Sequence, residues 1–182
     1  MIISQDPATL LSTNTLKVLS FLAENTGSDF TAGELLEFVS VSKSGIYLAL
    51  DELQNLHIIN KSQRGKFILY SAKYDDSFIK QFKVLQNITA LRPLLTKIEP
   101  NSIKIVLFGS ASRGEDRRES DIDLFILATV PQLIKKAISS TKLSRKLQAV
   151  IKTPAEFADL KESDRVFFHE IEKGILLRER KS

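Results

Sequence analysis

Apolar residues in the first third of the chain recur every three to four positions in three successive segments. This spacing is that of amphipathic helices, which bury one face and expose the other. Three short helices are therefore predicted, over residues 15–24, 31–39 and 43–56. Asn25, Gly27 and Ser28 separate the first predicted helix from the second.

Polar residues at the starts of these segments support the helix boundaries. Thr31 lies three positions before Glu34, which is the spacing of a capping box. Ser42 or Ser44 is suited to cap the third helix. After that helix, two β-forming runs flank a turn that contains Gly65, and this pattern predicts a β-hairpin.

The second part of the chain changes from helical spacing to alternating helices and strands. Residues 75–97 have helical periodicity and no Gly/Ser-rich or Pro-rich stretch, so we expect a packed connecting helix there. Beyond it, apolar runs predict strands over 103–108, 121–127 and 147–152, with a helix over 131–140. A Gly-rich turn separates the first two of these strands.

Composition narrows the class of protein. The 182 residues are 43% hydrophobic and 26% charged, which is typical of a globular protein. The absence of Cys excludes disulfides and thiolate sites, and two His are too few for a His-built metal centre. No apolar run is long enough to cross a membrane, and the start MIISQDPATLL is unlike a secretory signal. A cytoplasmic protein without membrane contact is therefore expected.

The net charge of +4 is unevenly distributed. Residues 1–75 carry six basic and eight acidic groups, a net of −2, whereas residues 76–182 carry 20 basic and 14 acidic groups, a net of +6. Within the first part, residues 40–73 hold five basic and two acidic groups, a local net of +3. A local basic patch is what binding to a phosphate backbone requires.

Three helices followed by a hairpin resemble a winged helix-turn-helix domain, over roughly residues 10–73. In that family the third helix enters the DNA major groove and the wing contacts the backbone. The resemblance implies double-stranded DNA as a partner and two copies pairing as a homodimer. It places the DNA-facing residues at the start of the third helix and at the tip of the wing: Ser42, Lys43, Ser44, Tyr47, Lys61, Arg64 and Lys66.

Two carboxylates stand at the start of the second predicted strand. Side chains alternate across a strand, so Asp121 and Asp123 share one face, about 7 Å apart, while Ile122 and Leu124 face the other way. Mg²⁺ is commonly held by one or two carboxylates together with substrate phosphates. The preceding Gly109-Ser110 turn offers backbone N–H groups that can hold a phosphate.

This pattern resembles the minimal nucleotidyltransferase domain of the DNA polymerase beta superfamily, over about residues 92–180. The matching residues are Gly109, Ser110, Arg113, Gly114, Ser120, Asp121, Asp123 and Leu124. The resemblance implies that Asp121 and Asp123 are catalytic and bind Mg²⁺ or Mn²⁺. It assigns the nucleoside triphosphate to Gly109, Ser110, Arg113, Gly114 and Ser120.

One feature departs from the family pattern. Active members usually carry a third carboxylate on the next strand, where this chain has Gln148. A neutral amide cannot take a proton from the acceptor hydroxyl as an anionic base does. Lys152, on the same face, adds positive charge.

The sequence thus predicts an α+β protein with three parts. They are a winged helix-turn-helix domain over 1–74, a connecting helix over 75–97, and an α/β nucleotidyltransferase-like domain with a small mixed sheet over 98–182. The preferred function is Mg-dependent nucleotidyl transfer to a hydroxyl of a protein, nucleic acid or small molecule. One alternative is a transcriptional regulator whose degenerate transferase domain senses nucleotide or mediates dimerisation. Another is a winged helix that docks on protein instead of DNA.

Overall fold

The computed structural model describes residues 13–180. The chain divides between Gln86 and Asn87 into two compact units. The expectation about a secretory signal rests on the first eleven residues, which lie outside the described part. In the part that is described, no helix is long and apolar enough to cross a membrane.

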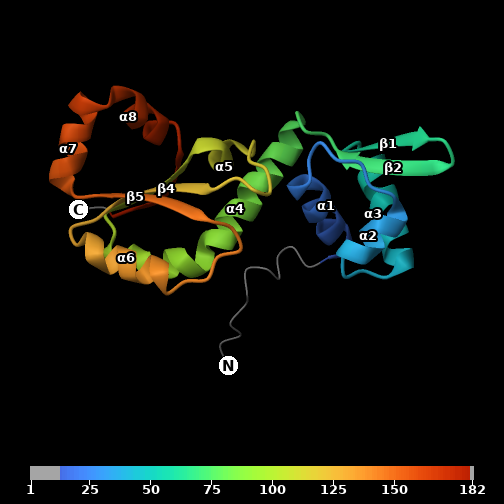
Figure 1. Ribbon diagram of the computed structural model, residues 1–182, viewed down its shortest axis with the longest axis horizontal. Coiled ribbons are helices and arrows are strands. Elements are labelled where there is room, and N and C mark those ends of the chain that lie inside the picture. The colour runs from blue at the N-terminus through green and yellow to red at the C-terminus, as the bar shows by residue number, and fades with distance from the viewer. Residues whose placement is uncertain (1–12, 181–182) are drawn as a thin grey trace. The chain divides into compact units, whose positions relative to one another are not determined.

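The first unit contains the predicted three helices and hairpin (Figure 1). In chain order its elements are α1 (Asn14–Glu24), α2 (Ala32–Phe38), α3 (Lys43–Asn55), β1 (Ile59–Arg64) and β2 (Phe67–Ala72). All three helices bury their apolar stripes in one core, which includes Leu19, Leu35 and Ile46. The periodicity in the sequence therefore identified the buried faces.

The helix caps follow the local sequence signals. At α2, the Thr31 side chain accepts from the Glu34 backbone and the Glu34 side chain accepts from the Thr31 backbone, which confirms the capping box. Ser42, not Ser44, caps α3, because its hydroxyl accepts from the backbone N–H of Gly45 at 3.2 Å.

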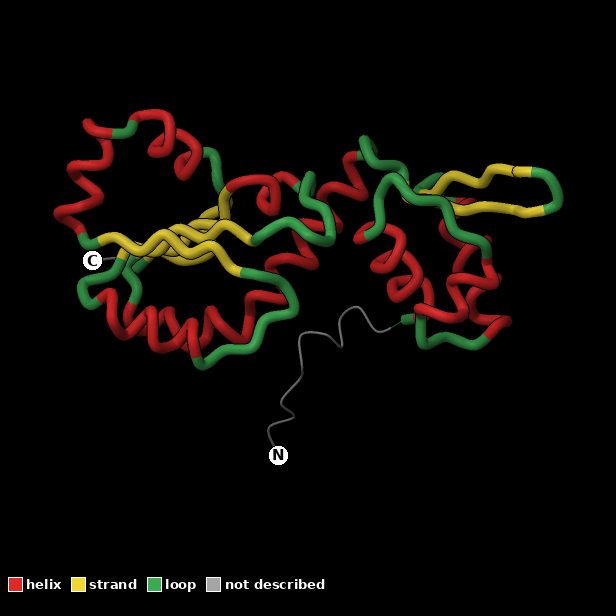
Figure 2. The backbone as a smooth tube through the Cα atoms, viewed as in Figure 1, coloured by secondary structure: helices red, strands yellow, loops and turns green. Residues whose placement is uncertain are grey.

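The hairpin is antiparallel, with Ile59 opposite Ala72 and Arg64 opposite Phe67. Phe30 adds an isolated bridge to Tyr70, so the segment before α2 pairs with the hairpin's second strand. On β1 Ile59 is buried and the other five residues are exposed, whereas on β2 the first two residues, Phe67 and Ile68, are exposed and Leu69 and Tyr70 are buried. Figure 2 shows the two strands extending beyond the helices of this unit.

The second unit begins within α4 (Ser77–Ile98), the helix that occupies most of residues 75–97. The elements that follow are η2 (Glu99–Asn101), β3 (Lys104–Phe108), α5 (Gly109–Arg113), β4 (Ile122–Leu127), α6 (Pro131–Ser139), β5 (Leu147–Lys152), α7 (Pro154–Ser163), α8 (Arg165–Glu172) and β6 (Ile175–Glu179). The predicted Gly-rich turn is the short helix α5. The α+β class is confirmed.

Four strands form one mixed sheet in the order β5-β4-β3-β6. Helix α6 and the second half of α4 cover one face, and α7 with α8 covers the other (Figure 1). Alternate residues of β4 enter the two cores: Leu124 packs in the α4/α6 core, and Phe125 packs in the α7/α8 core. Asp123 consequently points to the α7/α8 side.

Candidate functional site

The turn from β3 into α5 brings a glycine against one of the predicted carboxylates. Phe108 pairs with Asp123 across β3 and β4, so Gly109 begins α5 directly beside that side chain. Gly109 has φ of +69°, a conformation that favours glycine, and a Cβ atom there would overlap the Asp123 carboxylate. Both the backbone conformation and the close approach therefore require glycine.

Asp123 lies at the start of β4 and Asp121 immediately before the strand, on the face that the alternation predicted. The intervening Ile122 and the following Leu124 are buried in the opposite core. Burial, and to a smaller extent the charge of Asp121, raises the pKa of Asp123. Two mutually repelling carboxylates at one edge form a site where a cation is electrostatically favoured.

The parallel pairing of β4 with β5 decides what stands beside these two acids. Asp123 is paired with Gln148, and Ile122 with Leu147. One step earlier, the Lys146 ammonium lies 2.8 Å from the Asp121 carboxylate, and this hydrogen bond raises the pKa of Lys146. The strand that carries a third acid in the resembled family thus presents an amide and a cation here.

Two carboxylates are the acidic donors of this site. Within residues 13–180, no three acidic or histidine side chains come together as metal ligands. Asp121 and Asp123 supply the hard oxygen donors that Mg²⁺ or Mn²⁺ prefers, and phosphate oxygens and waters would supply the remainder. Gln148 offers at most a neutral oxygen beside them.

The residues that the resemblance assigns to nucleotide lie around this edge. Ser110 is in the first turn of α5, and Gly114 ends α5 with φ of +67°. Ser120 is fixed by two hydrogen bonds with Arg117: its hydroxyl accepts from the Arg117 N–H, and its own N–H donates to the Arg117 carbonyl. Arg113 is held by Glu115 at 2.9 Å and by Glu170 of α8 at 3.6 Å. A phosphate would therefore compete with two carboxylates for Arg113.

A buried polar network, absent from the sequence predictions, supports the loop that leads to Asp121. Arg145 donates to Asp116 at 2.6 Å and to the Asn87 side chain at 2.9 Å. It also donates twice to the Ser120 carbonyl, at 2.7 and 3.1 Å. Asn87 donates to the Ala111 carbonyl at 3.0 Å, which joins α4 to α5. Asp116 and Asn87 are almost fully buried.

One member of this network had a signal in the sequence. Asn87 stands four residues before Leu91 and seven before Leu94, on the stripe of α4 that faces the core. A polar residue on such a stripe indicates a buried hydrogen-bond partner. Asp116 and Arg145 lie in polar stretches of the sequence, where nothing distinguishes them from solvated charges.

The predicted DNA-facing residues of the first unit fall into two groups. Ser42, Lys43, Ser44 and Tyr47 occupy the exposed first turns of α3. On the hairpin, Lys66 lies in the turn, whereas Lys61 and Arg64 belong to β1, with Lys61 opposite Tyr70. Lys66 therefore lies at the tip of the wing, and Lys61 and Arg64 lie along its first strand.

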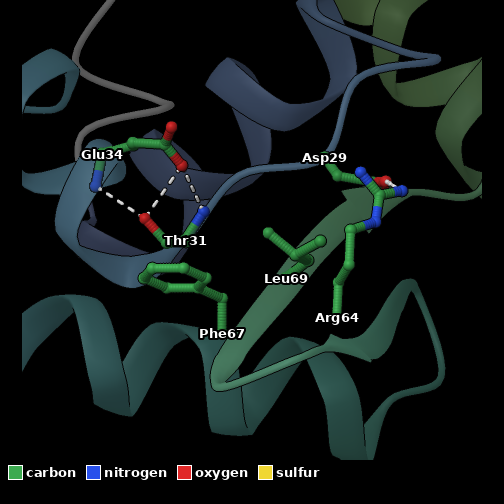
Figure 3. Close-up of a pocket in the computed structure, with 6 residues that line it drawn as sticks. All are labelled: Asp29, Thr31, Glu34, Arg64, Phe67 and Leu69. Carbon is green, nitrogen blue, oxygen red and sulfur yellow. Dashed lines mark hydrogen bonds and ion pairs between the residues drawn. The ribbon is translucent and has the colours of Figure 1, made fainter.

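Arg64 borders a hollow of about 470 Å³ between the hairpin and the start of α2. Figure 3 shows the Arg64 guanidinium turned toward Asp29, 3.7 Å away, with Phe67 and Leu69 on the hairpin side of the hollow. Asp29 therefore offsets part of the positive charge of Arg64. Lys66 lies over the Phe67 ring at 5.4 Å.

The sequence of the second unit matches a known family. The model of the family described as "Polymerase beta, Nucleotidyltransferase" matches residues 91–182, just over half of the chain. The chain belongs to this nucleotidyltransferase family. The match contains β3, α5 and β4 with the Gly109, Asp121 and Asp123 constellation, and it contains β5 with Gln148.

Similarity beyond that family is weak. No curated protein sequence matches the chain significantly. Among solved structures, the chain is similar to TrmBL2, described as an archaeal chromatin protein with a novel mode of DNA binding. The identity is 14%, the match covers 88% of this chain and 72% of that one, and the TM-score is 0.33. A TM-score of this size does not establish a shared fold.

Proposed function

We propose that this member of the polymerase beta nucleotidyltransferase family transfers a nucleotidyl group from a nucleoside triphosphate to an acceptor hydroxyl, with release of pyrophosphate and of the hydroxyl proton. The observation that carries the proposal is the packing of Gly109 against Asp123, beside Asp121. This arrangement brings the Asp123 carboxylate, with Asp121 beside it, against the backbone at the start of α5. The acceptor is a hydroxyl of a protein, nucleic acid or small molecule.

The chain's own residues bind and orient the substrates in this proposal. Asp121 and Asp123 would hold Mg²⁺ or Mn²⁺, which when bound neutralises phosphate charge and makes the acceptor hydroxyl more acidic. The Ser110 hydroxyl and the Gly109 backbone bind a phosphate. The Arg145 network fixes the Ser120 carbonyl and thereby the position at which Asp121 enters β4. Proximity of the two substrates supplies much of the acceleration.

Replacing both acids tests the transfer reaction. The variant Asp121→Asn/Asp123→Asn should transfer label from α-labelled nucleoside triphosphates at least about a hundredfold more slowly than wild type, since it loses the anionic metal ligands. Each triphosphate is incubated with Mg²⁺ or Mn²⁺ and cell extract as the source of acceptors, and labelled products are separated. The double variant Asp159→Asn/Glu162→Gln, at two exposed acids of α7, removes the same charge and is the matched control. Equal labelling by wild type and the double Asn variant would overturn the proposal.

A second function is favoured by the pairing of Asp123 with Gln148. Because Gln148 cannot act as an anionic base, the site would bind nucleotide without transferring it, and the protein would act as a nucleotide-responsive regulator. In that case wild type transfers no label, yet Mg-nucleotide raises its melting temperature and leaves that of the double Asn variant unchanged. The same pair of proteins therefore separates an enzyme from a sensor.

We further propose that the first unit binds double-stranded DNA, with the exposed start of α3 in the major groove and the wing on the backbone. Support comes from the exposed cations on both elements, Lys43 on α3 and Lys61 and Lys66 on the hairpin. Two copies would bind as a dimer to two half-sites. The competing interpretation, a protein-docking module, requires none of this positive charge.

Charge reversal on the wing tests DNA binding. The triple variant Lys61→Glu/Arg64→Glu/Lys66→Glu should weaken DNA binding by tenfold or more, and should lower the slope of log affinity against log salt by about two to three, because each lost phosphate contact removes about one unit. Affinities are measured by fluorescence anisotropy from ~50 to ~200 mM salt. The triple reversal of Lys135, Lys136 and Lys142, exposed in the other unit, changes net charge equally. Unchanged affinity in the wing variant would favour protein docking.

A further inference from the structure

Four side chains form a two-by-two arrangement at the edge of β4 and β5. Asp123 lies at the start of β4 and Gln148 at the start of β5, and Asp121 and Lys146 are the residues that immediately precede these two strands. The parallel register places Gln148 beside Asp123, and Lys146, two residues before Gln148, is in contact with Asp121. The neighbours of the two acids are therefore one cation and one amide.

The Lys146 backbone is fixed, whereas its ammonium is at the surface. Its carbonyl accepts from the N–H of Ile122 at 2.9 Å, which extends the ladder between the two strands. Its side chain is 79% exposed, while the Asp121 side chain is 28% exposed. A four-carbon stem on a fixed backbone lets the ammonium exchange one nearby anion for another without a change in the fold.

The neighbouring cation cannot do the same. Arg145 uses its guanidinium on Asp116, Asn87 and the Ser120 carbonyl, inside the unit. Of these two neighbouring cations, Lys146 is the one that contacts Asp121.

We propose that Lys146 is a latch of the site: its ammonium holds Asp121 while no nucleotide is bound and moves to a triphosphate oxygen when Mg-nucleotide enters. This inference rests on the proposed nucleotide binding at Asp121 and Asp123. A metal ion that binds without nucleotide must displace the ammonium from Asp121. No new anion is then present to bind the displaced ammonium. A metal ion arriving with a triphosphate brings a new anion for Lys146, so the metal–nucleotide complex is preferred over the free ion.

Opposite effects on two ligands test the latch. Lys146→Met should bind Mn²⁺ alone about three- to tenfold more tightly, because a competing cation is lost. The same variant should bind the α,β-methylene analogue of ATP with Mg²⁺ about three- to tenfold more weakly, because it loses a charged hydrogen-bond donor to a phosphate oxygen. Mn²⁺ binding is followed by electron paramagnetic resonance, and nucleotide binding by calorimetry. The analogue cannot undergo transfer, so neither readout depends on activity.

Two further variants make the result specific. Lys142→Met removes the same charge from an exposed position four residues earlier and should leave both affinities unchanged. Lys146→Met should also have no effect on Mn²⁺ binding when Asp121→Asn is already present. Effects of the same sign on both ligands, or no effect, would contradict the proposed role of Lys146 but not the proposed binding of nucleotide. If wild type binds neither probe, the proposed function fails together with the latch.

Discussion

Replacing Arg145 by methionine is expected to lower the free energy of unfolding of the second unit by about 3–5 kcal/mol, the usual cost of breaking a buried ion pair. The substitution leaves the Asp116 carboxylate buried with its 2.6 Å charged donor gone. It also removes the Arg145 hydrogen bonds that the Asn87 side-chain oxygen and the Ser120 carbonyl accept. The loop before Asp121 should therefore lose its support.

Amide hydrogen exchange of β3 and β4 measures this effect, because those central strands report on global opening of the second unit. The three tyrosines all lie in the first unit, so their fluorescence serves as a separate record of that unit during denaturation. Arg165→Met is the matched control. It breaks an exposed pair with Glu162 and should cost no more than about 1 kcal/mol.

A compensating variant checks the cause. Arg145→Met/Asp116→Leu removes both charges and should recover part of the lost stability, because an apolar pair avoids the uncompensated carboxylate. If Arg145→Met proves as mild as Arg165→Met, the network does not support the site. If the double variant is less stable than the single one, the buried charge of Asp116 in the absence of Arg145 is not the reason for the loss.

Replacing Gln148 by glutamate is expected to increase both metal binding and nucleotidyl transfer. The new carboxylate stands beside Asp123 in the parallel register, and Gln148 is exposed, so glutamate can ionise there. Affinity for Mn²⁺ should rise about tenfold from the added negative charge. Transfer of α-labelled nucleotide should rise by about a hundredfold or more, as expected when a general base is restored.

Gln148→Met is the control, because it keeps the length of the side chain and adds no charge. It should leave Mn²⁺ affinity within about twofold of wild type, since a neutral oxygen contributes little beside two carboxylates. If the Gln148→Glu variant binds Mn²⁺ no more tightly than wild type, a carboxylate at position 148 does not contribute to the metal site. Tighter Mn²⁺ binding without faster transfer would favour the nucleotide-sensing alternative.

Local sequence signals predicted much of the fold. Thr31 and Glu34 make their capping box three residues apart, so no distant contact is needed to specify the start of α2. The alternation from Asp121 to Leu124 determined which side chains share a face, because the period of a strand is two whatever the strand pairs with. The family pattern likewise lies within sixteen consecutive residues, 109–124.

The partners of those residues depend on segments far apart in the chain. Asp121 contacts Lys146 and Asp116 contacts Arg145, separations of 25 and 29 residues, because β5 pairs parallel to β4 after the α6 crossover. No local periodicity encodes that register or the burial of a charge. The sequence by itself determined the helices, the strands and the family, and it determined that Asp121 and Asp123 share a face. Tertiary structure decided that an amide and a lysine stand beside them, because strand pairing sets which distant side chains meet.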